Sequence, residues 1–361
     1  MSRQINAAVV GFGLAGQVFH CPFISAVDGL HLYAIVQRKG DEAAKAYPQT
    51  RILRSFEEAL ADPAIDLIVI ATPNKTHFEL AKRALEAGKH VVIDKPFAGS
   101  SLEAQTLITT SRTVHKIVAP FHNRRWDGDF LTVRKLIDSN QLGRIATFES
   151  HFDRFRPLQR ENTWKESADP TNGLLFDLGP HLIDQAIALF GAPKSITASV
   201  RSDRDATNIE DAFDITLHYD HHLAHLRSTM LAAAPSPRFL IHGTHGSFTK
   251  HGVDPQEPAL LAGQRPTDDT WLREPESLWG TLTIAPNPAD PGKLVTSLLP
   301  TERGDYRNYY ANVRDAINGT AQLIIRPQDA LLVIHLLELA RESTIEARTL
   351  PVSTSIETTY D

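Results

Sequence analysis

Two side chains with acid–base chemistry, Asp177 and His181, lie four residues apart near the middle of the chain. Residues at i and i+4 share one face of a helix, and the apolar residues around this pair recur at helical spacing. A carboxylate beside an imidazole fixes the tautomer of the ring and raises its basicity, which suits a general acid or base. The alternative is a helix N-terminus with an acidic cap and a buried structural histidine. Pro180 favours the first turn of a helix, so we expect Asp177 in or just before that turn.

A glycine-rich turn near the N-terminus has the pattern of a pyrophosphate-binding site. Its residues follow an apolar run and precede a helical pattern; they are Gly11, Phe12, Gly13, Leu14, Ala15 and Gly16. The first glycine allows a tight turn, the second lets the backbone approach the pyrophosphate, and the third lets helix and strand pack closely. The helix N-terminus then directs free N–H groups at the anion. The alternative is a plain strand–turn–helix junction, but the repeated strand and helix patterns downstream favour a dinucleotide site.

The residues after the second apolar run indicate which dinucleotide binds. NAD-dependent enzymes usually place an acid about 20 residues beyond the glycine turn. This chain has Gln37, Arg38 and Lys39 there, and the next acid, Asp41, lies further along. Cations attract the 2′-phosphate of NADP, and an arginine can also stack on adenine. We therefore expect NADP in preference to NAD; the alternative is a solvated basic turn.

Two more polar groups follow apolar runs at the positions where open α/β sheets hold their ligands. The first group contains Thr72, Pro73, Asn74 and His77, and the second is Asp94-Lys95-Pro96. We expect the first group to line the crevice beside the nicotinamide, although Asn74 or Thr76 could equally cap a helix. A rigid proline can aim Lys95 at the same crevice; the alternative is a surface lysine.

The elements that must position these residues differ between the two parts of the chain. Up to residue 121, continuous apolar runs alternate with amphipathic stretches, such as the helix predicted for residues 76–87. Unbroken apolar runs suit parallel strands covered on both faces, so we predict an α/β fold with a doubly wound Rossmann sheet over residues 1–121. Alternating strands with short turns predict an α+β domain with an open, mostly antiparallel sheet over residues 122–361. Within it, we expect residues 251–303 to form a long loop.

Composition excludes several classes of function. The 361 residues carry a formal charge of -6 and no basic stripe, which argues against a nucleic-acid partner. No apolar stretch approaches the length of a membrane span, and the N-terminus lacks the pattern of a signal peptide. The single cysteine, Cys21, fits a reducing compartment, so we expect a cytoplasmic protein. The cluster His218, His221, His222 and His225 surrounds a turn and is more typical of a solvated hairpin than of zinc, so we predict no metal.

Taken together, these segments resemble the Gfo/Idh/MocA oxidoreductases. The similarity rests on the glycine turn, on residues 71–74 with His77, on Asp94-Lys95-Pro96 and on residues 173–181. The family usually has Glu-Lys-Pro at the lysine, and Asp94 is a departure that keeps the charge. Residues 19–22, 121–127 and 153–157 are similar to the subgroup that contains NADP-preferring scyllo-inositol dehydrogenases.

The resemblance implies a role for each of the three candidate catalytic residues. Lys95 would hydrogen-bond the reacting oxygen and balance charge, His181 would be the general acid/base, and Asp177 would bind substrate hydroxyls or orient the base. The substrate, a polyol or sugar, would lie between the domains. Its candidate contacts are aromatic or capable of hydrogen bonds to hydroxyls; they are Arg124, Arg125, Trp126, Asp153, Arg156 and Trp164.

Two alternatives to a polyol or sugar dehydrogenase stay open. The family also contains co-regulators that bind the cofactor without catalysis, but such a protein should have lost Lys95 or His181. A dehydrogenase of another substrate, such as an aromatic dihydrodiol, would use the same three residues. We also expect a homodimer or higher homo-oligomer, because the outer face of an open sheet needs a cover.

Overall fold

The computed structural model describes residues 3–353, apart from residues 161, 162, 164, 165, 168, 206, 235, 269, 270, 272, 273, 288 and 291. The chain divides into two compact units. The first unit contains Met1–Asn123, Gln256–Trp271 and Asp305–Ile334. The second contains Arg124–Pro255, Leu272–Gly304 and His335–Asp361. The sequence-based division at residue 121 stays a prediction, and it did not anticipate that two later segments belong to the first unit.

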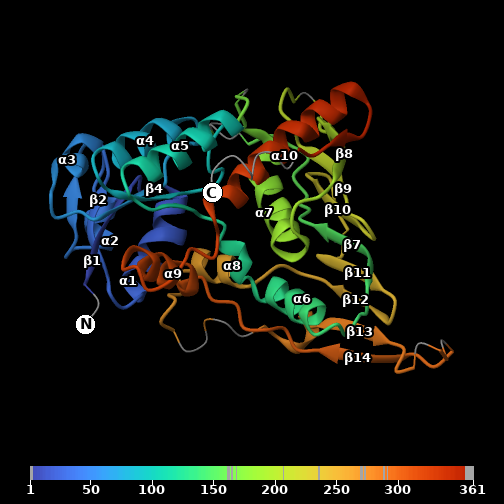
Figure 1. Ribbon diagram of the computed structural model, residues 1–361. Helices are drawn as coiled ribbons and strands as arrows, with labels where there is room; N and C mark the ends of the chain where they lie inside the picture. The colour runs from blue at the N-terminus through green and yellow to red at the C-terminus, as the bar shows by residue number, and fades with distance from the viewer. Residues whose placement is uncertain are drawn as a thin grey trace. The chain divides into compact units, whose positions relative to one another are not determined.

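The first unit is built on a six-stranded parallel sheet with the order β3-β2-β1-β4-β5-β6. The strands are β1 (Ile5–Val10), β2 (Leu30–Val36), β3 (Arg51–Leu53), β4 (Leu67–Ile70), β5 (His90–Ile93) and β6 (Val118–Pro120). Helices α4 (His77–Glu86) and α5 (Ser101–Thr113) cover one face, and α1 (Cys21–Ala26) and α9 (Arg307–Ile317) cover the other (Figure 1). This confirms the predicted doubly wound sheet. All four residues of β4 are buried, because helices cover both of its faces.

Shorter elements connect these strands. They are the π-helical turn η1 (Gly16–His20), α2 (Glu42–Ala46), α3 (Phe56–Ala61) and the 3₁₀ turn η2 (Asn74–Thr76). The chain after the glycine turn is therefore wound partly as a π-helix before α1 begins. The helix predicted for residues 76–87 is α4, and Gly88 follows it with a positive φ of 76°, as expected of a glycine C-cap.

The second unit is built on a nine-stranded sheet with the order β14-β13-β12-β11-β7-β10-β9-β8-β15. Its strands are β7 (Ile145–His151), β8 (Ser195–Arg201), β9 (Ala212–His218), β10 (Leu223–Thr229), β11 (Phe239–Gly243), β12 (Gly246–Lys250), β13 (Gly280–Ile284), β14 (Val295–Leu299) and β15 (Leu350–Pro351). Strands β7 and β10 pair in parallel and the other pairs are antiparallel. This confirms the predicted open, mostly antiparallel sheet.

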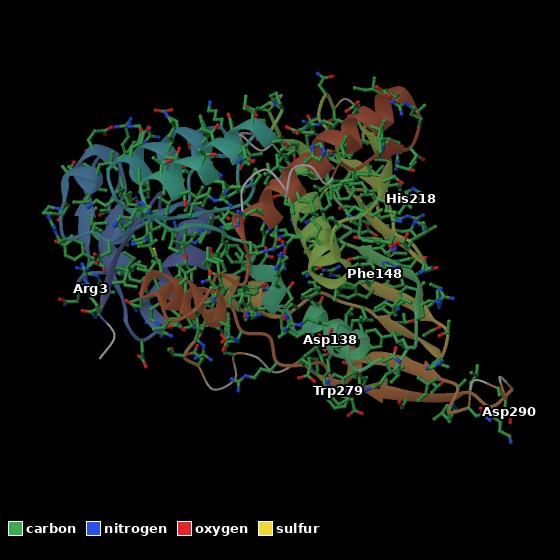
Figure 2. The ribbon with its side chains drawn as sticks, viewed as in Figure 1. Arg3, Asp138, Phe148, His218, Trp279 and Asp290 are labelled. Carbon is green, nitrogen blue, oxygen red and sulfur yellow. The ribbon has the colours of Figure 1, made fainter. Side chains whose placement is uncertain are left out.

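Helices α6 (Gly128–Asp138) and α7 (Gly173–Phe190) lie on one face of this sheet (Figure 1). Residues alternate between the two faces, as the period of a strand requires. Phe148 is fully buried on the covered face, where its ring meets Phe190 of α7 at 5.3 Å. His218 points to the opposite side (Figure 2). The remaining elements are η3 (Asn123–Trp126), α8 (Gln256–Leu261), η5 (Glu276–Leu278) and α10 (Pro327–Glu346).

The expectation that residues 251–303 form a long loop is wrong. This segment contains α8 and η5, and its strands β13 and β14 extend the sheet beyond β12. In β13, Leu282 faces the core between Thr281 and Thr283, and β14 at the edge is exposed throughout or nearly so. A short edge strand buries little apolar surface, so its sequence carries only a weak alternating pattern. Strand β7 ends at His151, and Phe155 adds only a single bridge to Leu231.

Among the described residues, no helix combines the length and the apolar character needed to cross a lipid bilayer.

Candidate active site

The glycine turn has the geometry that a dinucleotide requires. Gly11 has φ of 103°, and a Cβ there would lie 2.4 Å from the carbonyl oxygen of Ala71. A Cβ on Gly16 would lie 2.2 Å from the carbonyl oxygen of Gly11. By contrast, a Cβ on Gly13 would meet no atom within 4 Å, so its bare backbone faces open space. The turn therefore combines two positions that only glycine fits with one that leaves room for a pyrophosphate.

The tip of β2 presents cations, as the sequence indicated, but it also holds groups that the sequence did not. Arg38 and Lys39 are exposed. Arg54, which follows β3, donates through Nη1 to the carbonyl oxygens of Gln37 at 3.0 Å and Gly40 at 2.7 Å. Sequence reasoning missed Arg54 because parallel pairing of β2 with β3 brings it to the tip from 15 residues further along the chain.

The side chain of Gln37 bonds to the start of α2. Its Oε1 accepts from the backbone N–H of Ala43 at 2.8 Å, and its Nε2 donates to the Glu42 carboxylate. Backbone hydrogen bonding, followed by the Gln37 contact, lowers the pKa of Glu42, so this carboxylate is charged at neutral pH. Sequence reasoning considered Asp41 and missed Glu42. Asp41 instead forms an i, i+4 ion pair with Lys45 at 3.0 Å.

The segment after β4 is braced by hydrogen bonds of its own. Thr72 and Thr76 share a hydroxyl–hydroxyl bond of 2.7 Å, and Thr76 also donates to the carbonyl oxygen of Pro73 at 2.7 Å. His77 is 1% exposed, and its two ring nitrogens each lie 2.8 Å from a backbone carbonyl oxygen, that of Pro96 for Nδ1 and that of Thr72 for Nε2. The predicted cofactor contact His77 therefore uses both of its ring nitrogens on the main chain.

Asp94 and Lys95 follow β5 at the carboxyl end of the sheet. The Oδ1 atom of Asp94 accepts from the backbone N–H of Lys95 at 2.8 Å. Burial pushes the pKa of Asp94 upward, but hydrogen bonding and charge from His20, with Lys95 and His77, outweigh it, so the pKa lies below its usual value. Asp94 is therefore an anion at neutral pH, directly before the predicted catalytic lysine.

A histidine–tyrosine pair that sequence reasoning missed contacts this carboxylate. His20 is fully buried, its Nδ1 lies 2.6 Å from the hydroxyl oxygen of Tyr310, and its Nε2 lies 3.8 Å from Oδ2 of Asp94. The ring also packs on Phe121 at 4.4 Å. Only the tertiary fold brings Tyr310 to His20, because the two residues are 290 positions apart.

Asp177 and His181 both lie on α7, one helical turn apart. Pro180 stands in the interior of this 18-residue helix, so the expectation that it marks the first turn is wrong. The helix instead begins at Gly173, whose positive φ of 86° sets its start, and apolar burial along α7 stabilises it around the proline. His181 is 5% exposed. Asp177 accepts from Nη1 of Arg154 at 3.2 Å, a partner that the sequence did not predict.

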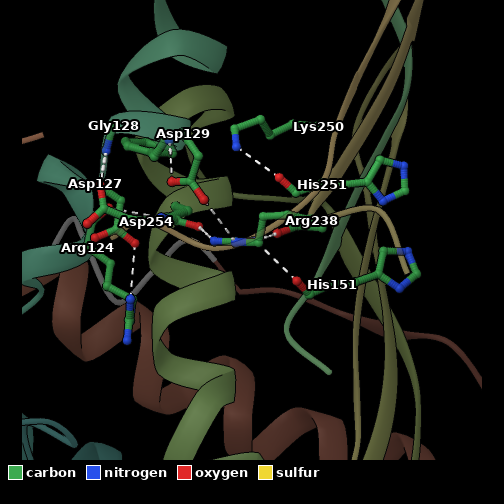
Figure 3. A network of polar contacts seen from close by, with 12 residues as sticks. Arg124, Asp127, Gly128, Asp129, His151, Arg238, Lys250, His251 and Asp254 are labelled. Atoms are coloured by element: carbon green, nitrogen blue, oxygen red, sulfur yellow. Dashed lines mark hydrogen bonds and ion pairs between the residues drawn. The ribbon is translucent and has the colours of Figure 1, made fainter. Parts of the chain in front are cut away.

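Two predicted substrate residues are engaged in buried ion pairs of the second unit. Arg125 makes a two-point contact with Asp184, with Nε and Nη2 at 2.9 and 2.7 Å from its two carboxylate oxygens. Arg124 pairs with Asp127 at 3.2 Å (Figure 3). Its guanidinium also lies over the ring of Phe152, 4.8 Å from the ring centroid. Trp126, in the same turn, is 8% exposed.

The same network extends across the covered face of the sheet. Arg238 is 2% exposed; it donates to Oε1 of Gln185 at 2.7 Å and lies 3.4 Å from Oδ2 of Asp129 (Figure 3). Asp254 accepts from the backbone N–H of Gly128, the first residue of α6, at 2.7 Å. These contacts tie α6 and α7 to the strands, and so fix the helix that carries Asp177 and His181.

The remaining predicted contacts lie near the end of β7. Asp153 accepts from the backbone N–H of Thr229 at 3.1 Å, and Arg156 is exposed. Partial desolvation of its guanidinium group, then the charges of the neighbouring Arg154 and Arg160, lowers the pKa of Arg156. Trp164 lies outside the described residues.

Three of the clustered histidines of the second unit have separate partners, two of them threonine hydroxyls and one a tyrosine ring. His218 contacts the Thr197 hydroxyl at 2.8 Å, His225 contacts that of Thr216 at 3.0 Å, and His222 stacks on Tyr219. No group of three or more His, Cys, Asp or Glu side chains suited to a metal ion occurs in the described part of the chain.

Comparison with known proteins settles the family. Residues 5–122 match the model of the oxidoreductase family NAD-binding Rossmann fold, and residues 134–353 match that of the oxidoreductase family C-terminal alpha/beta domain. The chain belongs to the Gfo/Idh/MocA oxidoreductase family. It is thus an oxidoreductase by family, with a dinucleotide-binding domain, as the sequence predicted.

Relatives match the chain over nearly its whole length. The uncharacterized oxidoreductase YdgJ of Escherichia coli is 42% identical, over 97% of this chain and 99% of that protein. The scyllo-inositol 2-dehydrogenase (NADP(+)) IolW of Bacillus subtilis is 36% identical, over 96% of this chain and 95% of its own. The solved structure of the yvaA protein of Bacillus subtilis superimposes with a TM-score of 0.93 at 35% identity, covering 98% of this chain and 99% of that one.

Proposed function

We propose that this chain is an NADP(H)-dependent dehydrogenase that interconverts a hydroxyl and a carbonyl group on a polyol or sugar of the inositol type. The observation that carries the proposal is that one chain contains both a dinucleotide-binding turn and side chains suited to acid–base catalysis. One unit has a dinucleotide turn and a lysine at the end of β5, and the other has a carboxylate and an imidazole one turn apart on α7. The similarity to IolW, whose name states a scyllo-inositol substrate and NADP, supports the same choice.

The residues fit the cofactor. The open backbone at Gly13 accommodates the pyrophosphate, and Arg38 and Lys39, with Arg54 behind them, suit the 2′-phosphate. Thr72, Pro73 and Asn74, together with Lys95, would contact the nicotinamide end. When bound, NADP supplies the acceptor for a hydride from the substrate carbon.

The chain's own groups handle the proton and the charge. His181 takes the hydroxyl proton, and Asp177 binds a neighbouring hydroxyl or orients the imidazole. The ammonium group of Lys95 hydrogen-bonds the reacting oxygen and stabilises the negative charge that develops on it. Arg154, which contacts Asp177, holds that carboxylate in place. Arg124, Arg125, Trp126, Asp153, Arg156 and Trp164 stay predictions as substrate contacts; the buried ion pair of Arg125 favours a structural role for it.

A panel of inositols, other polyols, sugars and sugar lactones, assayed with NADP and with NAD, tests the proposal. We expect cofactor reduction with at least one cyclic polyol or sugar, with a larger kcat/KM for NADP. The His181→Ala variant should lose this activity while NADP binding persists. Tight NADP binding without turnover of any polyol or sugar would contradict the proposal and favour a non-catalytic co-regulator or a non-sugar substrate such as a dihydrodiol.

We also propose a cytoplasmic homodimer. The outer face of the second-unit sheet carries side chains such as Thr216, His218 and Arg227, none of them fully buried, and a second copy of this face is an economical cover. The single cysteine, Cys21, is buried, so the chain needs no oxidising compartment.

A further inference from the structure

His77 lies between two backbone segments that the proposed function assigns to the cofactor crevice. It begins α4, and its ring sits between the chain after β4 and the chain after β5. Its Nε2 is 2.8 Å from the carbonyl oxygen of Thr72, and its Nδ1 is 2.8 Å from that of Pro96. The side chain therefore bridges the residues that follow two neighbouring strands.

The hydrogen-bond chemistry of this bridge fixes how many protons the ring carries. A carbonyl oxygen can only accept, and a neutral imidazole has only one N–H. Two carbonyl partners at 2.8 Å are both satisfied only when each ring nitrogen holds a proton. A neutral ring would set a bare nitrogen against a carbonyl oxygen in a site that is 1% exposed, and such an unsatisfied buried contact is costly.

A buried imidazolium needs a compensating negative charge, and Asp94 supplies one. The charge of His77 is among the influences that hold the pKa of Asp94 below its usual value, which places the carboxylate within electrostatic range. Asp94 also accepts from the backbone N–H of Lys95 and lies 3.8 Å from Nε2 of His20. The basic groups that act on the Asp94 carboxylate are therefore His20, Lys95 and His77.

We propose that His77 is a positioning residue that works as a buried imidazolium, tying Thr72 to Pro96 through its two ring N–H groups and thereby holding Lys95 in place. This inference rests on the proposed function for the role of Lys95. The positive charge of the ring follows from the hydrogen bonds alone. Loss of either proton would release one of the two carbonyl groups, and a shift of about 1 Å at a reacting group can cost about 10²-fold in rate.

His90 is a matched internal control, because it stands at the other end of β5 and makes the opposite kind of bond. Its Nδ1 accepts from the backbone N–H of Ile117 at 3.0 Å, so this nitrogen carries no proton. Burial, then the charge of Lys116, lowers the pKa of His90 to about 4. At neutral pH, His90 is therefore a neutral histidine in the same sheet.

Proton-coupled nitrogen spectra of the full chain labelled with ¹⁵N-histidine test the charge directly. Resonances are assigned by their loss in His77→Gln and His90→Asn. At pH 7 we expect His77 to show a proton on both ring nitrogens, and His90 to show a bare Nδ1. A single protonated nitrogen on His77 at pH 7 would overturn the proposal, whether or not the chain turns over any polyol.

The positioning role has its own readout. With a polyol substrate, His77→Gln should lower kcat by about 10²-fold and leave the polyol KM within about twofold, since the ring does not contact substrate. His90→Asn should keep the wild-type kcat. A wild-type kcat in a folded His77→Gln protein would refute the role. If that variant does not fold, the same assay on His77→Asn decides, and a wild-type kcat in that folded variant would refute the role.

Discussion

Two substitutions at the exposed tip of β2 should change the affinity for NADP in opposite directions. Arg38→Ala removes a cation proposed to bind the 2′-phosphate of NADP. Glu42→Gln removes a carboxylate that Gln37 holds beside the same tip. Because NAD lacks the 2′-phosphate, both substitutions should act on NADP binding and spare NAD binding.

The expected sizes follow from the chemistry of the contacts. A hydrogen bond to a charged group contributes about 2 kcal/mol, so Arg38→Ala should raise the Kd of NADP by about 30-fold. The Glu42 carboxylate repels a phosphate bound at the same tip, so Glu42→Gln should lower that Kd. Arg54 holds the loop through two backbone carbonyl groups, and Arg54→Ala should therefore weaken NADP binding as well.

Fluorescence titrations with NADPH and NADH at fixed ionic strength measure these effects, because phosphate contacts weaken with salt. Lys82→Ala serves as the control, since Lys82 lies on α4 and is already paired with Glu86 at 3.3 Å. It should change neither Kd by more than about twofold. Equal losses for NADPH and NADH in Arg38→Ala, or tighter wild-type binding of NADH, would refute the assignment of the tip to the 2′-phosphate.

Four further outcomes are expected. His181→Ala should lower kcat by about 10²–10⁴-fold with the Kd of NADP unchanged, and His242→Asn, an exposed control, should not. The pKa of His90 is about 4 in the folded chain and 6.5 in its model value, so the unfolded chain takes up a proton first as the pH falls. The free energy of unfolding should therefore drop by up to about 3 kcal/mol between pH 6.5 and pH 4. Urea unfolding of His90→Asn should show a smaller drop. Arg238→Met should lower the free energy of unfolding by about 3–5 kcal/mol, because it leaves the Asp129 carboxylate buried with less compensating charge. The double variant Arg238→Met with Asp129→Asn should regain part of this stability. Sedimentation equilibrium at micromolar concentration should give twice the monomer mass; the monomer mass would contradict the dimer.

The first-unit sheet was predictable because its strands are buried on both faces. Apolar runs such as Leu67–Ile70 and His90–Ile93 coincide with β4 and β5 residue by residue. The glycine turn was predictable for a related reason, since Gly11 and Gly16 meet backbone oxygens that no Cβ can approach. Where sterics or continuous burial dictate the residue type, the local sequence is sufficient.

Contacts across long stretches of chain were not predictable. The bonds from His20 to Tyr310 and from Arg154 to Asp177 involve ordinary polar residues whose partners only the tertiary fold supplies. Strands β13 and β14 were missed because an exposed edge imposes little apolar alternation. The start of α7 was predicted wrongly, because Pro180 usually stands in the first turn of a helix. Here, burial of its neighbours stabilises the helix around the proline despite the missing N–H.

Some of the buried charges of this fold lie beside proposed catalytic residues. An ion pair in a protein interior gains little stability over apolar packing, because desolvation offsets the attraction. Displacing one partner nevertheless raises the free energy steeply, because the other charge is left buried without compensation. Such pairs therefore fix side-chain positions more than they stabilise the fold. Asp94 with His20 and His77 surrounds the main chain at Lys95, and Arg125 with Asp184 anchors the middle of α7 close to His181. We infer that, in each unit, buried charges fix the positions of proposed catalytic groups although they add little to the stability of the fold.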